Sequence, residues 1–181
     1  MPSLMPSRAL GAVLLCAAMP VAAHAVELPT RKSGLWEIKM AVAAAGDRPA
    51  MTMQQCTDET TDKQLTARFN AAPSASCTKH DLQKTANGYV MDSECGGNGV
   101  TMTSHAEIIG DFNSAYTMKV SSKHTGPGVA RDTDVTVEAK WLGACTADQK
   151  AGDIIMPGGV KMNVKDLEAM KDNVKNMMKK Q

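Results

Sequence analysis

Cysteine and methionine are the residue types in this chain best suited to specific chemistry. The chain has five cysteines, and the last four are spaced 21, 18 and 50 residues apart without any Cys-x-x-Cys pair. This spacing excludes zinc-ribbon and thioredoxin-type sites. In an exported chain the same four residues predict two disulfides. They are Cys56, Cys77, Cys95 and Cys145.

Methionine is abundant, with 14 residues, and Met51 and Met53 would place two thioethers on one face of a strand. Thioether sulfur suits Cu(I), so a Met-based copper site is one hypothesis. Methionine also fills hydrophobic cores, and a chain with only two Trp, two Tyr and two Phe needs core volume from other residues. We therefore expect packing roles for most methionines and no bound cofactor, with Met51 and Met53 as the weak alternative metal ligands.

No pattern of catalytic residues stands out, so we expect no enzyme activity. His80, His105 and His124 are too scattered for a close pair of metal ligands. Asp132 and Asp134 alternate along a predicted strand. Such an alternation is more typical of a solvated sheet face than of paired catalytic carboxylates.

The N-terminal segment has the three parts of a secretory signal peptide. Arg8 supplies a positive charge, residues 9–23 are apolar, and a small-x-small site ends at Ala25. We predict cleavage between Ala25 and Val26 and a periplasmic mature protein. The apolar stretch is shorter than the ~20 residues of a bilayer span, and no second one follows, so we expect no transmembrane segment after cleavage.

Cleavage would remove Cys16 and leave an even set of four cysteines. Because Cys16 follows Leu15 rather than a small residue, a lipoprotein anchor is disfavoured. The whole chain has 20 Lys and Arg against 19 Asp and Glu, and loss of Arg8 would make the balance zero. Such neutrality argues against nucleic acid as a partner. An envelope protein or a small ligand remains as the expected partner.

Apolar and polar residues alternate through most of residues 34–142, which predicts about seven antiparallel strands joined by short turns. The expected fold is mainly β: a meander, sandwich or open barrel. A short helix over about 58–69, with Thr57 as a candidate N-cap, interrupts the strands. The predicted domains are a signal peptide (1–25), a disulfide-stabilised β domain (26–162) and an amphipathic C-terminal helix (163–181).

The Asn-Gly pair at 87–88 is typical of a two-residue type I′ turn and predicts a hairpin with His80 opposite Cys95. This register puts Cys77 on the other face, so a Cys77–Cys95 bridge would need a bulge or a slipped register. Four cysteines allow three pairings. We favour the pairing Cys56–Cys77 with Cys95–Cys145.

Three short motifs, taken with the order of the four cysteines, carry a resemblance to a known family. They are Gly34-Leu35-Trp36-Glu37, the stretch 140–145 with its Trp-Leu-Gly-Ala-Cys, and the Pro-Gly-bearing stretch 152–162. Together they resemble the secreted bacterial family called domain of unknown function 3617, over about residues 32–162. The resemblance implies export in Gram-negative bacteria, often to the periplasm, and it transfers no catalytic residue.

These observations favour an exported, non-catalytic binding or envelope-associated module that holds a ligand on one sheet face or in its interior. The alternatives are a Met-based Cu(I)-binding protein and a small hydrolase. Exposure of Met51 and Met53 together, near a third soft ligand, would favour copper binding. A concave site with converging titratable groups would favour an enzyme.

Overall fold

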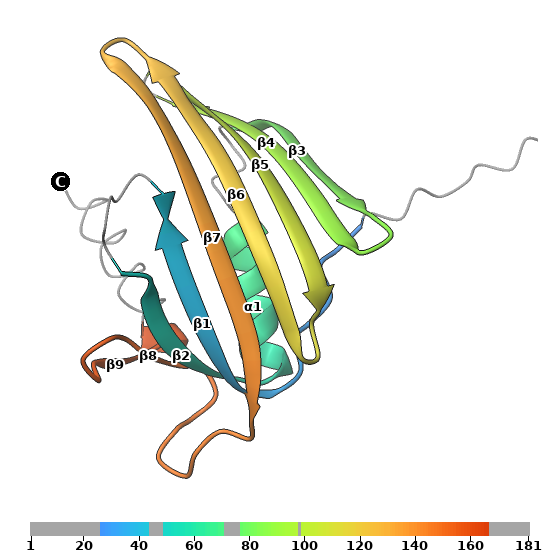
Figure 1. Cartoon of the computed structure of the whole chain (residues 1–181), viewed down its shortest axis with the longest axis vertical. Coiled ribbons are helices and arrows are strands. Elements are labelled where there is room, and N and C mark those ends of the chain that lie inside the picture. The colour runs from blue at the N-terminus through green and yellow to red at the C-terminus, as the bar shows by residue number, and fades with distance from the viewer. Residues whose placement is uncertain (1–25, 44–48, 71–76, 98, 167–181) are drawn as a thin grey trace, which may run out of the picture.

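One antiparallel sheet of nine strands makes up most of the protein (Figure 1). The computed structural model describes residues 26–43, 49–70, 77–97 and 99–166, with the side chains of 68–70 left out. The strand order is β3-β4-β5-β6-β7-β1-β2-β8-β9, so β3 and β9 are the two edges. The strands are β1 Gly34–Val42, β2 Met51–Thr57, β3 Cys77–Lys84, β4 Gly88–Gly97, β5 Val100–Asp111, β6 Ala115–Gly126, β7 Val129–Gly143, β8 Asp153–Ile155 and β9 Lys161–Asn163.

The predicted mainly β, antiparallel architecture is confirmed; of the expected forms, the structure shows one open sheet with two edges. Strands β1 to β7 correspond to the seven expected from alternation. Strands β8 and β9 are two three-residue additions after the seven expected strands. Sequence alternation could not indicate them, because three residues are too few to show a period of two.

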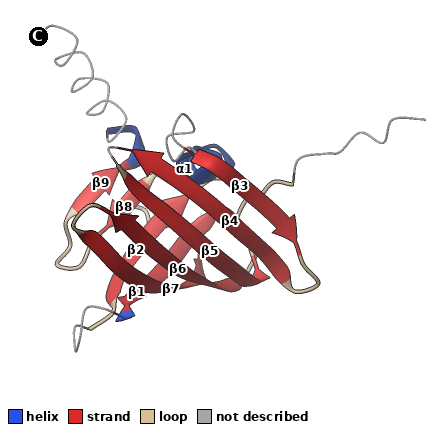
Figure 2. Cartoon of the chain, turned by 90° about the horizontal axis from the view of Figure 1, so that it is seen from above, coloured by secondary structure: helices blue, strands red, loops and turns tan. Residues whose placement is uncertain are grey.

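The sheet curls around the helix α1 (Glu59–Asn70), which lies on its concave side (Figure 2). We call this side the inner face and the other side the outer face. The cross-strand register assigns each residue to a face, since paired residues share a face and neighbours along a strand alternate. One inner row, for example, runs through Met40, Val137, Met118 and Ile108.

The core lies on the inner face at the end of the sheet where β1 begins. Trp36 is fully buried there, and a chain of ring contacts extends from it across the sheet. Ring centroids are 5.9 Å apart for Trp36 and Tyr116, 4.9 Å for Tyr116 and Phe112, and 6.0 Å for Phe112 and Tyr89. These four aromatic residues thus form one chain of ring contacts at this end of the sheet.

The β3–β4 hairpin has a different register from the expected one. Leu82 lies opposite Met91 rather than Ser93, because the turn is longer than two residues and is closed by a hydrogen bond from Thr85 N to Gly88 O (2.9 Å). A bulge near the start of β3 shifts the register again. The expectation that His80 lies opposite Cys95 is therefore wrong, and Cys77 takes that position.

The favoured disulfide pairing is wrong as well. The disulfides are Cys77–Cys95 and Cys56–Cys145. The first follows from the bulge, which brings Cys77 opposite Cys95. The second follows from strand order: Leu35 of β1 pairs with Cys56 on one side and with Gly143 on the other, so Cys145 ends close to Cys56.

Helix α1 begins one residue later than expected, and Asp58 rather than Thr57 is its N-cap. Thr61 N donates to Asp58 Oδ1 (2.8 Å), and Asp58 N donates in return to Thr61 Oγ1 (3.0 Å). This reciprocal pair satisfies backbone donors at the helix start. The bond from Thr61 N also lowers the pKa of the Asp58 carboxyl.

The predicted C-terminal helix is described only at its beginning. Val164 is fully buried, and Lys165 N donates to Asn163 Oδ1 (3.0 Å), a capping contact that matches the expected helix start. Residues 167–181 lie outside the described residues. No helix in the described part of the chain combines the length and the apolar character that a membrane span requires.

Candidate functional site

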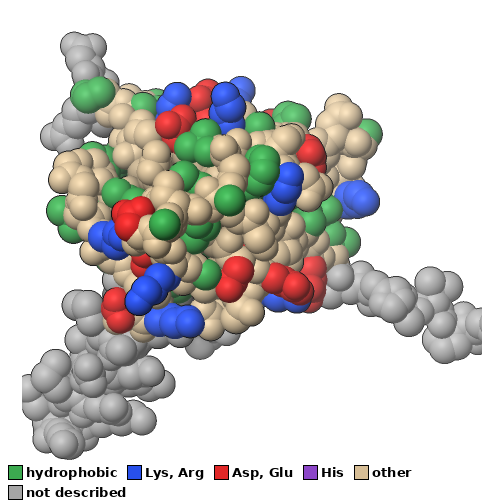
Figure 3. All heavy atoms as spheres, turned by 90° about the horizontal axis from the view of Figure 1, so that it is seen from below, with side chains coloured by type: hydrophobic (Ala, Val, Ile, Leu, Met, Phe, Trp, Pro, Cys, Tyr) green, Lys and Arg blue, Asp and Glu red, His purple; other side chains and the backbone are tan. Residues whose placement is uncertain are grey.

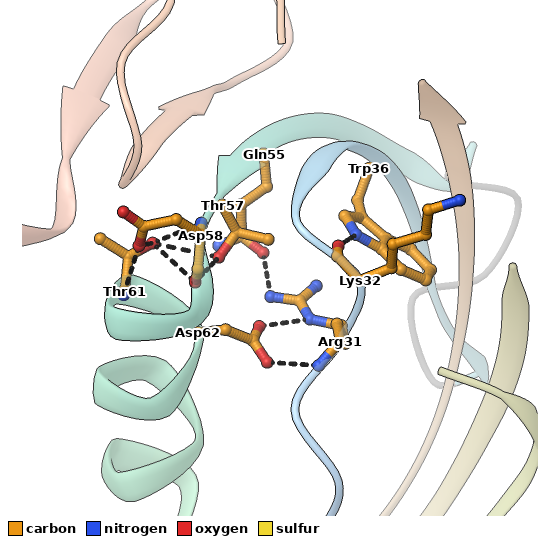
Figure 4. Close-up of polar contacts among 8 residues, drawn as sticks. All are labelled: Arg31, Lys32, Trp36, Gln55, Thr57, Asp58, Thr61 and Asp62. Carbon is orange, nitrogen blue, oxygen red and sulfur yellow. Dashed lines mark hydrogen bonds and ion pairs between the residues drawn. The ribbon is translucent and has the colours of Figure 1, made fainter. Parts of the chain in front are cut away.

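A buried ion pair fastens α1 to the sheet (Figure 4). Arg31, just before β1, donates from its backbone N to Asp62 Oδ2 (2.7 Å) and from Nε to Oδ1 (2.6 Å). Its Nη2 donates to Gln55 Oε1 (2.7 Å), and its guanidinium lies 5.6 Å from the centre of the Trp36 ring. The Arg31 side chain is only 9% exposed and that of Asp62 only 1%.

This Arg31–Asp62 pair is a structural fastening rather than a reactive group. Both carboxylate oxygens of Asp62 accept hydrogen bonds from Arg31, so a buried charge is matched by a bidentate partner. The adjacent indole is anchored too, because Trp36 Nε1 donates to Lys32 O (2.8 Å). We call this part of the inner face the closed end.

The closed end is also the end of the molecule seen from below in Figure 3. Hydrophobic side chains lie across the middle of that view, and charged side chains lie mainly toward its edges. Burial raises the pKa of the Tyr116 hydroxyl, on the inner face between β5 and β7. Of the four aromatic groups at the closed end, Trp36 is fully buried and Tyr89, Phe112 and Tyr116 are partly buried.

Farther along the strands, the inner face stays apolar but is only partly buried. Ala106, Ile108 and Val137 are buried, whereas the apolar residues around them keep intermediate exposure. We call this set the apolar strip: Leu82, Met91, Ala106, Ile108, Met118, Val120, Val135 and Val137. A half-exposed apolar surface on the concave side of a sheet is typical of a binding surface.

Beyond the apolar strip, one hydroxyl side chain per strand crosses the inner face. The register places these residues opposite one another on four neighbouring strands, and we call them the hydroxyl row: Ser93, Ser104, Ser122 and Thr133. Ser122 Oγ donates to Ser104 Oγ (3.1 Å). The next inner row holds His124 and Arg131, opposite each other, with Met102 and Cys95 on the neighbouring strands. On β6 and β7 the inner face therefore changes from apolar to polar along the strands.

A hollow of about 420 Å³, lined mainly by polar and charged side chains, lies over β4 to β7. Asp92, His105, Ser121 and Asp134 occupy consecutive register positions there on the outer face. His105 Nδ1 lies 2.8 Å from Asp92 Oδ1, and this contact raises the pKa of the imidazole and lowers that of the carboxyl. Sequence reasoning did not bring these side chains together, because their proximity depends on strand order.

Asp92, His105, Ser121 and Asp134 include the residue types of a Ser-His-Asp triad, but their hydrogen bonds are not arranged as in a triad. Ser121 Oγ donates to Asp134 Oδ1 (2.6 Å), so its proton is directed away from His105. His105 Nε2 lies 3.7 Å from Glu107, and the imidazole is half exposed. A working triad needs the serine proton directed to the histidine and donors arranged for an oxyanion. The observed row is better explained as a solvated network of hydrogen bonds and ion pairs.

The metal candidates named from the sequence lie on the inner face. Met53 pairs with Ile38 and Met51 with Met40 across the β1–β2 hairpin, and Met51 and Met53 are half buried. Asp132 and Asp134 are exposed on the outer face. Within the described residues, no three His, Cys, Asp or Glu side chains are close enough to hold a metal ion.

A family model matches residues 31–145, about two thirds of the chain; its description is "Protein of unknown function (DUF3617)". The chain belongs to this family. No curated protein and no solved structure matches the chain.

The DUF3617 match encloses the structural features described above. It begins at Arg31 of the buried ion pair and ends at Cys145, the last disulfide cysteine, while β8 and β9 lie beyond it. Sequence reasoning singled out neither Arg31 and Asp62 nor the hydroxyl row. The period-two pattern did contain a signal for the hydroxyl row. In β5 and β6 every second residue faces the same side of the sheet, and these residues are apolar near one end of the strand but include Ser104 and Ser122 toward the other end.

Proposed function

We propose that this DUF3617 protein is an exported, non-catalytic module that binds an apolar ligand on the inner face of its sheet. The observation that carries the proposal is the apolar strip. Its residues face the concave side, yet most of them are only half buried, whereas Trp36 at the closed end is fully buried. Contact with a ligand would remove that apolar surface from water, which stabilises the complex by about 25 cal/mol for each Å² buried.

The export part of the proposal rests on the N-terminal sequence and on the cysteines. A charged residue, an apolar stretch and a small-residue site precede Val26, and disulfides persist in oxidising compartments. Expression of the full chain in a Gram-negative host, followed by fractionation and N-terminal sequencing, tests this part. We expect the protein in the periplasmic fraction with Val26 at its start. A full-length chain in the cytoplasm would contradict it.

The binding part can be tested with the apolar fluorophore N-phenyl-1-naphthylamine. We expect fluorescence enhancement with the wild-type protein and affinity reduced at least about 10-fold by Met118→Lys, because a charge in the apolar strip must be desolvated. Thr117→Lys is the matched control, since it adds the same charge on the outer face one residue away. Equal affinities for the two variants, at similar urea midpoints, would contradict the proposal.

One specific observation supports a second candidate, a Cu(I) site. The cross-strand pair of Met40 and Met51, with Met53 two residues along, brings a third thioether to the two named from the sequence. Competition with a Cu(I) chelator tests it. If copper binds there, replacing Met40, Met51 and Met53 by Leu should abolish binding, whereas replacing Met91, Met102 and Met118 by Leu should not. Absence of Cu(I) binding by the wild-type protein would exclude this candidate.

A further inference from the structure

We infer that the ligand of the inner face is a single-chain amphiphile with an anionic head, of the long-chain fatty acid type. Its alkyl chain would lie along the apolar strip, and its carboxylate would lie at the hydroxyl row beside Arg131 and His124. This inference rests on the proposed function and adds the chemistry of the ligand to it.

The first argument is the order of polarity along the strands. On β6 the inner positions run from Tyr116 through Met118 and Val120 to Ser122 and then His124. Ser122 lies six positions after Tyr116, so about 20 Å separates the aromatic cluster from the hydroxyl row along β6, at ~3.4 Å per residue. The aromatic cluster ends it on one side and the hydroxyl row on the other. Such a surface matches a molecule with one long apolar part and one polar end.

The second argument is the distribution of charge between the two faces. The register places every carboxylate of strands β3 to β7 on the outer face: Asp81, Asp92, Glu94, Glu107, Asp111, Asp132, Asp134 and Glu138. On the inner face of the same strands, the side chains that can carry charge near neutral pH are bases: His80, Lys84, His124 and Arg131. An anionic head is therefore electrostatically favoured on the inner face, and a cationic head is not.

The polar end of the inner face could also be no more than the solvated end of a sheet. The outer face shows what a solvated surface of this protein looks like, because there Lys123 lies opposite Asp132 and Lys79 opposite Glu94. Both signs are mixed on that side. On strands β3 to β7 the inner face has hydroxyls and bases without carboxylates, and its Ser122–Ser104 hydrogen bond joins two half-buried residues. This asymmetry is the feature that points to an anion.

The experiment compares two amphiphiles with the same alkyl chain and opposite heads. Isothermal titration calorimetry with tetradecanoate and with tetradecyltrimethylammonium, each below its micelle concentration, measures the preference of the full-length secreted protein. We expect tetradecanoate to bind at least about 10-fold more tightly. Arg131→Gln should remove most of this preference. Lys123→Gln, which removes a neighbouring positive charge from the outer face, should retain it.

Equal affinity for the two amphiphiles, or an equal loss in both variants, would overturn the inference. Binding of N-phenyl-1-naphthylamine by wild type and by Arg131→Gln separates this failure from that of the proposed function. If the neutral fluorophore binds and the anion preference is absent, only the head-group assignment fails. If neither the fluorophore nor tetradecanoate binds, the proposed function fails as well.

Discussion

The two ends of the inner face use the same strands and the same alternation of residues but differ in burial. At the closed end, Trp36 is fully buried, and the Arg31–Asp62 pair holds α1 in place above it. At the other end, which we call the open end, Met102, Ser104 and their neighbours remain half exposed. The closed end resembles a protein core, and the open end resembles a binding surface.

This difference suits a fold in which one end of the inner face stabilises the protein and the other end binds a ligand. A chain with six aromatic residues has few large side chains for a core, and it joins four of them in one chain of ring contacts at the closed end, with helix α1 fastened beside them. The closed end therefore combines the fully buried Trp36 with the buried ion pair that fastens α1. The open end can keep apolar surface exposed because it contributes less to folding stability.

The largest expected difference between the two ends concerns their disulfides. Cys56–Cys145 links residues 89 apart beside the closed end, and Cys77–Cys95 links residues 18 apart at the open end. The loop-entropy relation predicts losses of about 4–5 and about 3 kcal/mol when each pair is replaced by Ser. Urea unfolding of the oxidised protein measures both. A larger loss at Cys77–Cys95 would contradict the view that the closed end carries the stability.

Removal of Asp62 should have the next largest effect. Asp62→Ala leaves the buried Arg31 guanidinium without its carboxylate, and we expect a loss of about 3–5 kcal/mol in the free energy of unfolding. Glu59→Ala is the matched control on the same helix, since it breaks only the exposed pair with Lys63 (2.6 Å) and should leave the urea midpoint almost unchanged. Similar urea midpoints for the two variants would show that the buried pair does not fasten α1.

Two valines of β7 compare the ends on the same strand and face. Val137 is 7% exposed, whereas Val135, two residues nearer the open end, is only half buried. Val137→Ala should lower the free energy of unfolding by about 1.5–2.5 kcal/mol, and Val135→Ala by less than about 1 kcal/mol. Equal losses would mean that the strip is covered over its whole length, and the argument for a binding surface would lose its basis.

The smallest effect concerns the outer-face pair of His105 and Asp92. Asp92 raises the pKa of His105 above its usual 6.5, so the stabilisation is fully present below that value and is lost as pH rises through the higher pKa of the folded protein. The stabilisation is also lost at low pH, as the pH falls through the pKa of Asp92, which the folded protein lowers below its usual 3.8. Because the pair is exposed, the energy is small. NMR titration should show the His105 pKa falling in Asp92→Asn; an unchanged value would contradict the assignment.

Much of the fold could be predicted from local patterns. The alternation of Trp36, Ile38 and Met40 indicates β1, and acidic residues after Thr57 indicate the start of α1 within one residue. These predictions succeed because strand faces and helix starts depend on residues close together in the chain. The candidate site was harder to predict from the sequence, because the hydroxyl row is assembled from four strands and their order and register do not depend on neighbouring residues alone.

The sequence by itself determined the β class, the approximate strand bounds and the even set of four cysteines. Only the tertiary structure decided which cysteines pair, because Cys56 meets Cys145 through the strand order β7-β1-β2 and Cys77 meets Cys95 through a bulge. It also decided that Arg31 meets Asp62, 31 residues away, and that the acids and bases of β3 to β7 separate onto opposite faces. These features depend on register, and a shift of one residue moves a side chain to the other face.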